Sequence, residues 1–175
     1  MRVEEVRGIL SRRIHENDIL ELLYYRQEQK DIAEELIECV FDEDAKVSRN
    51  ALWVLTWDII DRTEPFRSRL VALALMTPHV AIRRLSMTLL EKMRWEMEDV
   101  RVDFLDFCFE KMLSESEPPG VRALCIKLCY HLGRHYPELL DELKLMLCEL
   151  ADMPMSPAVA CSRKNILNRI EKSRK

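Results

Sequence analysis

Apolar residues recur at the spacing i, i+3, i+4 and i+7 along almost the whole chain, and this helical period is the feature that most limits its possible folds. No stretch alternates between apolar and polar residues for long enough to indicate a β-strand. The 175 residues include only three glycines, too few for the tight turns of a β-rich fold or for a phosphate-binding glycine loop. The sequence therefore predicts an all-α protein.

Breaks in this period, marked by proline, asparagine, aspartate or serine, divide the chain into about ten helical segments. Proline occurs near the start of several segments, where it fits because the first helical N–H has no intrahelical partner. Short connections fold neighbouring helices antiparallel. The predicted segments span residues 3–14, 17–28, 30–42, 46–62, 65–76, 79–95, 98–114, 118–134, 137–152 and 156–173.

Three of these segments begin with one register, a β-branched residue followed by a polar or basic run, with a small residue four positions later. The β-branched residues are Val47, Ile82 and Val121, and the small residues are Ala51, Ser86 and Cys125. The register recurs after 35 and 39 residues (82−47 and 121−82). A small side chain at a fixed position allows a neighbouring helix to approach closely. A weaker fourth copy covers residues 158–163, so the chain is predicted to be built from repeats.

This register resembles the HEAT family of helical repeats, whose second helix typically opens with Val-Arg followed by a small residue. The resemblance implies an α–α superhelix, a HEAT-like solenoid of about ten antiparallel helices, with residues 30–173 forming four helix pairs. Residues 1–29 then form N-terminal capping helices over the first pair. Asp42 matches the acidic residue at the end of the family's first helix. The chain, residues 1–175, is expected to form a single repeat domain; an irregular helical bundle is the alternative.

Charge and cysteine content limit the compartment and the partner. The sequence has 27 basic and 31 acidic residues, and this net charge of −4 disfavours non-specific attraction to nucleic acid. Charges near the N-terminus exclude a secretory signal, and the longest apolar run, Leu70–Met76, is too short to cross a membrane. Six cysteines lie in apolar helical patterns and are predicted to be core thiols. We expect a cytoplasmic protein with no membrane contact.

In a stack of this kind the second helices line the concave face, and the repeat register gathers aromatic and charged residues there. Tryptophan and arginine are the residue types that anchor protein interfaces. The alternative is structural: the tryptophans pack between repeats, and the arginines at the helix starts tie one repeat to the next through carboxylates. The predicted binding residues are Trp53, Trp57, Asp61, Arg83, Arg84, Lys92, Lys127 and His131.

No complete catalytic or metal-binding set accompanies these residues. His131 and His135 have the spacing of a metal-binding pair, but the sequence supplies no third ligand. We therefore predict no cofactor, no metal and no catalytic residue. The predicted function is a non-enzymatic scaffold or adaptor whose concave face binds a macromolecular partner, a protein of unknown identity.

One run supports an alternative function. Trp57-Asp58-Ile59-Ile60-Asp61 resembles the Trp-Asp-x-x-Asp run of the HEAT-like alkylpurine DNA glycosylases, and Pro78–Arg84 resembles their Arg-Arg helix start. This resemblance implies that Asp61 is the catalytic carboxylate, that Trp57 shelters a cationic base, and that Arg84 holds backbone phosphate. The 22 residues from Asp61 to Arg83 (83−61) are fewer than that family usually has, and the acidic net charge disfavours DNA. The alternative is a DNA-binding relative of these DNA alkylation repair enzymes.

Overall fold

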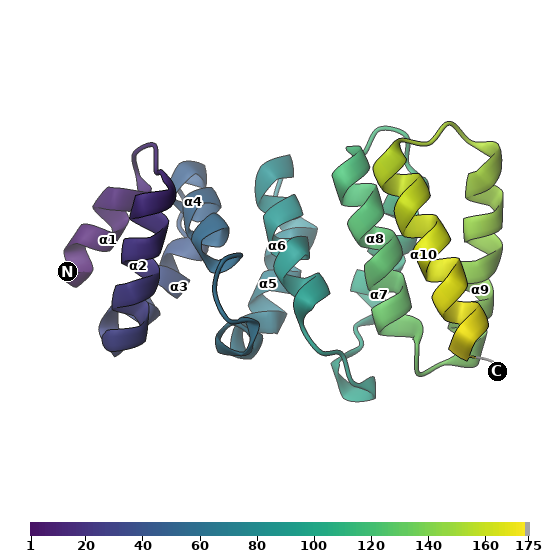
Figure 1. Ribbon diagram of the computed structural model, residues 1–175, viewed down its shortest axis with the longest axis horizontal. Helices are drawn as coiled ribbons and strands as arrows, with labels where there is room; N and C mark the ends of the chain where they lie inside the picture. The colour runs from purple at the N-terminus through teal and green to yellow at the C-terminus, as the bar shows by residue number, and fades with distance from the viewer. Residues whose placement is uncertain (174–175) are drawn as a thin grey trace. The chain divides into compact units, whose positions relative to one another are not determined.

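The computed structural model describes residues 1–173, which fold into ten α-helices and contain no β-strand (Figure 1). The helices are α1 (Val3–Leu10), α2 (Glu16–Glu28), α3 (Lys30–Val40), α4 (Ala45–Leu55), α5 (Arg67–Met76), α6 (Val80–Lys92), α7 (Val102–Leu113), α8 (Pro119–Gly133), α9 (Pro137–Glu149) and α10 (Pro157–Ser173). Short 3₁₀ turns occupy Ile60–Arg62, Glu64–Phe66, Met97–Asp99 and Leu150–Asp152. The all-α prediction is confirmed. None of the described helices is long and apolar enough to cross a membrane.

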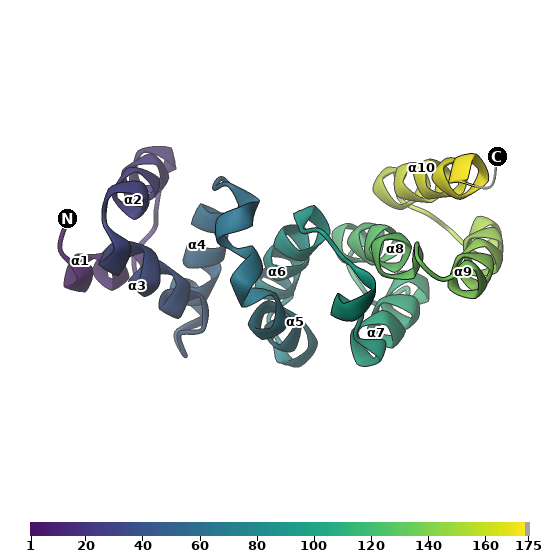
Figure 2. The ribbon, with the colours of Figure 1, turned by 90° about the horizontal axis from the view of Figure 1, so that it is seen from below.

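The chain divides into two compact units, Met1–Leu89 and a second that starts at Leu90, so that the boundary falls within α6. In the first unit α1 and α2 both pack against α3, which pairs with α4. In the second unit α7 and α8 form a close pair, and α10 packs against α8 and α9 (Figure 2). The assignment of residues 1–29 as a cap, and of residues 1–175 as one repeat domain, stays a prediction.

The repeat register points into the core in each of the three strong copies. Val47, Val121, Ala51, Ser86 and Cys125 are completely buried, and Ile82 is 4% exposed. In the weaker fourth copy Val159 and Ser162 are buried, whereas Cys161 between them is exposed. Like positions in successive second helices therefore serve the same packing role.

The residue after each of these β-branched positions holds the two helices of a pair together. The Ser48 hydroxyl donates to the carbonyl of Val40 (2.6 Å), and Arg83 Nη2 donates to the carbonyl of Thr77 (2.8 Å). Arg122 Nε donates to the carbonyl of Met112 (3.1 Å). The last carbonyls of a helix have no intrahelical donor, so these side chains satisfy groups that would otherwise be left unpaired. The fourth pair has a related contact, from Arg163 to the carbonyl of Leu147.

The predicted segment 46–62 is wrong at its end, because α4 stops at Leu55. The Thr56 hydroxyl and the backbone N–H of Thr56 both bond to the carbonyl of Trp53, which closes the helix. Trp57 lies in the turn that follows, and Asp61 lies in the 3₁₀ turn Ile60–Arg62. The uninterrupted period suggested that the two tryptophans and Asp61 form a stripe along one helix. The structure shows that they do not.

The prediction for the cysteines holds at four of the six positions. Cys39, Cys108, Cys125 and Cys129 are buried, whereas Cys148 and Cys161 are exposed; all six are free. Burial and the neighbouring Glu35 raise the pKa of Cys39 to about 12, so its thiol stays protonated and unreactive. Cys148 lies on α9 and Cys161 lies on α10.

Candidate functional site

A groove in the first unit brings together basic side chains and two exposed tryptophans. It has a volume of about 600 Å³, and we call it the tryptophan groove. The start of α2 and its preceding loop supply Arg13, Ile14, His15 and Glu16; α4 and the turn after it supply Lys46, Arg49, Asn50, Trp53 and Trp57; and α6 supplies Ala81, Arg84 and Leu85. The groove is thus formed by residues distant in sequence and lies within a single unit.

The two tryptophans keep large exposed surfaces. Trp53 is 37% exposed and Trp57 is 49% exposed, although apolar side chains of this size usually lose most of their exposure on folding. Trp95, the third tryptophan of the sequence, is 1% exposed and donates its indole N–H to the carbonyl of Leu90 (2.8 Å). The structure therefore uses one tryptophan in the core and leaves two at the groove.

A buried ion pair holds the turn that presents Trp57. Arg26 Nε of α2 lies 2.5 Å from Asp58 Oδ2, and the two side chains are only 3% and 2% exposed. Burial lowers the pKa of Arg26, while the charge of Asp58 opposes that shift, and arginine remains protonated in proteins. Asp58 also accepts the backbone N–H of Ile59 (2.8 Å). These contacts fix the backbone on the C-terminal side of Trp57.

Asn50 fixes the loop between α1 and α2. Its side-chain amide, buried in α4, donates to the carbonyls of Leu10 (2.8 Å) and Arg12 (2.9 Å), and so ties the loop after α1 to α4. The Asn50 side-chain oxygen accepts hydrogen bonds from the Arg49 guanidinium. One buried amide therefore positions both Arg49 and the loop that carries Arg13.

The basic residues of the first unit fall into three groups. Eight of them form ion pairs with carboxylates within the described part of the unit: Arg2, Arg7, Arg12, Arg26, Lys30, Arg62, Arg67 and Arg69. Arg83 donates to the backbone carbonyls of Ala74 and Thr77. The remaining four have no ion pair with any residue of 1–173, and all four line the tryptophan groove: Arg13, Lys46, Arg49 and Arg84.

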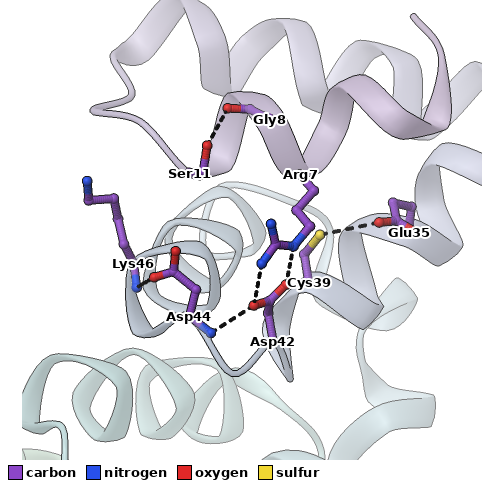
Figure 3. A network of polar contacts seen from close by, with 8 residues as sticks. All are labelled: Arg7, Gly8, Ser11, Glu35, Cys39, Asp42, Asp44 and Lys46. Atoms are coloured by element: carbon purple, nitrogen blue, oxygen red, sulfur yellow. Dashed lines mark hydrogen bonds and ion pairs between the residues drawn. The ribbon is translucent and has the colours of Figure 1, made fainter.

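A well-defined member of the paired group lies away from the groove. Arg7 donates two hydrogen bonds to Asp42, from Nε to Oδ2 (2.7 Å) and from Nη2 to Oδ1 (3.1 Å), as Figure 3 shows. Asp42 also accepts the backbone N–H of Asp44 (2.8 Å), which in turn caps α4 by accepting from the N–H of Lys46. These bonds hold the pKa of Asp42 below its usual value. The acidic residue that matched the repeat family is thus part of the structural framework.

The structure brings together some of the predicted binding residues and separates others. Trp53, Trp57 and Arg84 share the tryptophan groove, whereas Asp61 is exposed and does not line it. Arg83, next to Arg84, is used within its helix pair. Whether these residues bind a partner stays a prediction.

The predicted residues of the second unit gather around a half-buried carboxylate. Lys127 Nζ and His131 Nε2 of α8 lie 3.6 and 3.9 Å from Glu91 Oε1. The His131 ring and Lys127 lower the pKa of Glu91, against the effect of burial. Lys92, also predicted, lies at the end of α6 and is exposed. Across residues 1–173, no three His, Cys, Asp or Glu side chains are grouped in a way that would hold a metal ion.

Arg13, Lys46 and Arg49 were not among the binding residues predicted from the sequence. The repeat register could have identified Arg49 and Arg84, because each lies two positions after a β-branched residue, Val47 or Ile82. The residues one position after Val47 and Ile82, Ser48 and Arg83, bond within the helix pair. Arg13 and Lys46 have no such signal, because their place depends on how α1 and α2 pack on α4.

Comparison with protein families gives a match that covers most of the chain. Residues 6–170 match the family described as a HEAT repeat domain. No curated protein matches the chain.

Proposed function

Because the chain belongs to the HEAT repeat family, we propose that it is a non-enzymatic helical-repeat scaffold or adaptor that binds a protein partner at the tryptophan groove. The observation that carries this proposal is the coincidence of four cations without an ionic partner in residues 1–173 and two exposed tryptophans in one groove. Tryptophan and arginine are enriched among the few residues that carry most of the binding energy at protein interfaces. The groove lies largely on α4 and α6, the second helices of their pairs, which are the helices predicted to line a concave face.

The proposal also accounts for the way in which the groove is built. The Arg26–Asp58 ion pair and the Asn50 amide hold Trp57, Arg49 and the loop before α2 in place. A site whose side chains are already ordered loses less conformational entropy on binding. Lys127, His131 and Lys92 remain predicted contributors from the second unit. A reducing compartment such as the cytoplasm fits the six free thiols.

Affinity capture with quantitative mass spectrometry tests the proposal. The bait is the full chain, compared with Trp53→Ala/Trp57→Ala and with Tyr24→Ala, which removes an aromatic side chain that is 60% exposed on α2 and is outside the groove. Truncation of a tryptophan that is an interface hot spot weakens binding by about 2 kcal/mol or more, about a 30-fold loss. We expect a specific partner to be lost with the double variant and kept with Tyr24→Ala. Identical partners for all three baits would remove the groove from consideration.

The same groove supports the alternative function, a DNA-binding protein related to the HEAT-like glycosylases. The specific observation in its favour is that Arg13, Lys46, Arg49 and Arg84 lie beside Trp57, where phosphates would be attracted. A mobility shift on duplex DNA at about 50 mM salt tests binding, because phosphate contacts are strong at low salt. If binding occurs, release of an alkylated base by the wild type and its loss in Asp61→Asn would support the catalytic role of Asp61, whereas undiminished release would exclude it.

A further inference from the structure

The charge of the tryptophan groove is opposite to the charge of the unit that contains it. Four basic residues and one acidic residue, Glu16, line the groove, a local charge of +3 (4−1). Residues 1–89 contain 13 basic and 16 acidic residues, a net charge of −3 (13−16). A positive groove on a negative unit attracts an anionic group only at short range.

We propose that the ligand of the tryptophan groove is a short acidic segment of a partner protein that also carries a large apolar side chain. This inference rests on the scaffold function proposed above and specifies the chemistry of its partner. Carboxylates of the segment pair with the guanidinium groups of Arg13, Arg49 and Arg84, which bind carboxylates in a planar, two-point geometry. The apolar side chain packs on the exposed faces of the two tryptophans.

The groove cations form no ion pair with a described residue and can therefore pair with these carboxylates. The other arginines of the unit are occupied: Arg69 pairs with Glu38 (2.8 Å) and Arg7 with Asp42 (2.7 Å), for example. Arg49 bonds only the neutral oxygen of Asn50, which leaves its charge uncompensated by any described residue. An incoming carboxylate at the groove therefore gains an ion pair without breaking an existing one.

A second depression extends the groove and favours an extended segment over a single small anion. It has a volume of about 210 Å³ and shares Lys46, Arg49 and Ala81 with the tryptophan groove. It continues to His79 and Ile82 at the start of α6. The shared cations thus line both the hollow with the tryptophans and the hollow with a histidine, so an extended segment can pair with these cations and occupy both hollows.

The charge of the unit favours a peptide over a nucleic acid. A nucleic acid carries phosphates beyond the length of the groove, and the net negative charge of the unit repels them. Exposed carboxylates of the unit include Asp31 and Glu34 on α3. A short acidic segment places its charges only where the cations are. Glu16 at the groove adds repulsion for a continuous polyanion, whereas a peptide backbone N–H can donate to it.

The experiment measures binding of the full chain to a library of fluorescein-labelled peptides with fixed aspartate and glutamate positions and randomised residues between them. A matched library with asparagine and glutamine at the fixed positions removes the charge alone. Single-stranded oligothymidylate and a DNA duplex are measured beside them. The groove variant is Arg49→Glu/Arg84→Glu. The control, Lys144→Glu/Lys164→Glu, makes the same change in net charge on α9 and α10 of the second unit.

We expect acidic peptides enriched in aromatic or aliphatic residues to bind about tenfold or more tightly than the amide library, and more weakly as salt rises. Binding should fall about tenfold or more in the groove variant and in Trp53→Ala/Trp57→Ala, with little change in the control. Circular dichroism of each variant establishes that it is folded.

Three other outcomes overturn the inference, and they separate its failure from that of the scaffold function. Absence of peptide binding, with a cellular partner still lost in the tryptophan variant, removes the acidic segment and leaves the scaffold function. Tighter binding of oligothymidylate or duplex, sensitive to the groove variant, replaces the peptide by nucleic acid. Absence of peptide binding together with unchanged partners in every variant removes both proposals.

Discussion

Asp58 and Asp61 are three residues apart but have opposite environments, so we expect their substitution to have different effects on the free energy of unfolding. Asp58 is buried against Arg26, and Asp61 is exposed. Removing one partner of a buried ion pair leaves an uncompensated charge and typically costs about 3–5 kcal/mol. We expect Asp58→Ala to lower the free energy of unfolding by about that amount, measured by urea denaturation followed by circular dichroism.

The matched control is Asp61→Ala, since changes at exposed positions usually stay within about 0.5 kcal/mol. A second variant, Arg26→Met/Asp58→Leu, replaces both charges by apolar groups and should lose less stability than Asp58→Ala alone. Equal effects of Asp58→Ala and Asp61→Ala would show that the ion pair does not hold the turn after α4.

The Arg7–Asp42 contact predicts a pH dependence. Asp42 has a lowered pKa because it accepts hydrogen bonds from Arg7 and from the N–H of Asp44. A carboxyl group with a lowered pKa in the folded state stabilises the protein above its unfolded pKa of about 3.9, and this contribution is lost as the pH falls through the folded pKa. We expect Arg7→Gln to be less stable than the wild type at neutral pH, and the difference to shrink as the pH falls below about 4.

Urea denaturation at a series of pH values measures this difference. Arg13→Gln removes the same charge from a residue that forms no ion pair within residues 1–173, so its effect should vary less with pH. A difference between the wild type and Arg7→Gln that is constant down to acid pH would contradict the proposed origin of the Asp42 shift.

At the level of the helices, we expect the side chains that cap the first helix of each pair to contribute to stability. Arg122 is 6% exposed and donates to the carbonyl of Met112 near the end of α7. Hydrogen bonds to charged groups contribute about 1.5–3 kcal/mol, and a buried carbonyl left without a donor adds to the loss. Arg122→Met, which preserves much of the side-chain volume, should lower the free energy of unfolding by about this amount.

Chemical denaturation gives the loss, and Lys164→Met on α10 is the control because that residue is exposed. The second unit is where this effect should be observed, since both partners belong to it. If the two substitutions destabilise the protein equally, the Arg122 contact does not explain why arginine occupies this position of the repeat.

The elements that could be predicted from the sequence are those decided by local periodicity. The burial of Val47, Ile82 and Val121 follows from a pattern that each helix contains on its own. The end of α4 does not: the 3.6-residue period continues past Leu55, but a distant residue, Arg26, stabilises Asp58 in a turn instead. Tertiary contacts of this kind override helical propensity and are invisible to a local pattern.

The candidate site divides in the same way. Trp53, Trp57 and Arg84 were predicted because tryptophans and arginines at repeated positions stand out in the sequence. Arg13 and Lys46 were not, because their place at the groove depends on the packing of α1, α2 and α4. Grouping Asp61 with the tryptophans on one helix assumed a continuous helix from 46 to 62, whereas α4 ends at Leu55. A binding or catalytic role of Asp61 stays a prediction.

At the scale of the whole molecule, each of the two compact units has its own tryptophan environment. Trp53 and Trp57 belong to the first unit and are exposed, and Trp95 belongs to the second and is buried. In repeat proteins each repeat contacts only its neighbours, so a local loss of stability does not have to spread along the chain. Each unit should therefore respond first to changes made within it.

Trp95 offers a direct measurement of this behaviour. In a Trp53→Phe/Trp57→Phe background, Trp95 is the remaining tryptophan of the sequence, and its fluorescence reports the second unit alone. We expect Arg122→Met to move the urea midpoint of Trp95 fluorescence to lower concentration, and Asp58→Ala to leave it nearly unchanged while moving part of the far-ultraviolet circular dichroism transition. If Asp58→Ala moves both signals together, the chain unfolds as one cooperative domain over residues 1–175, because destabilisation of the first unit then reaches the second in full.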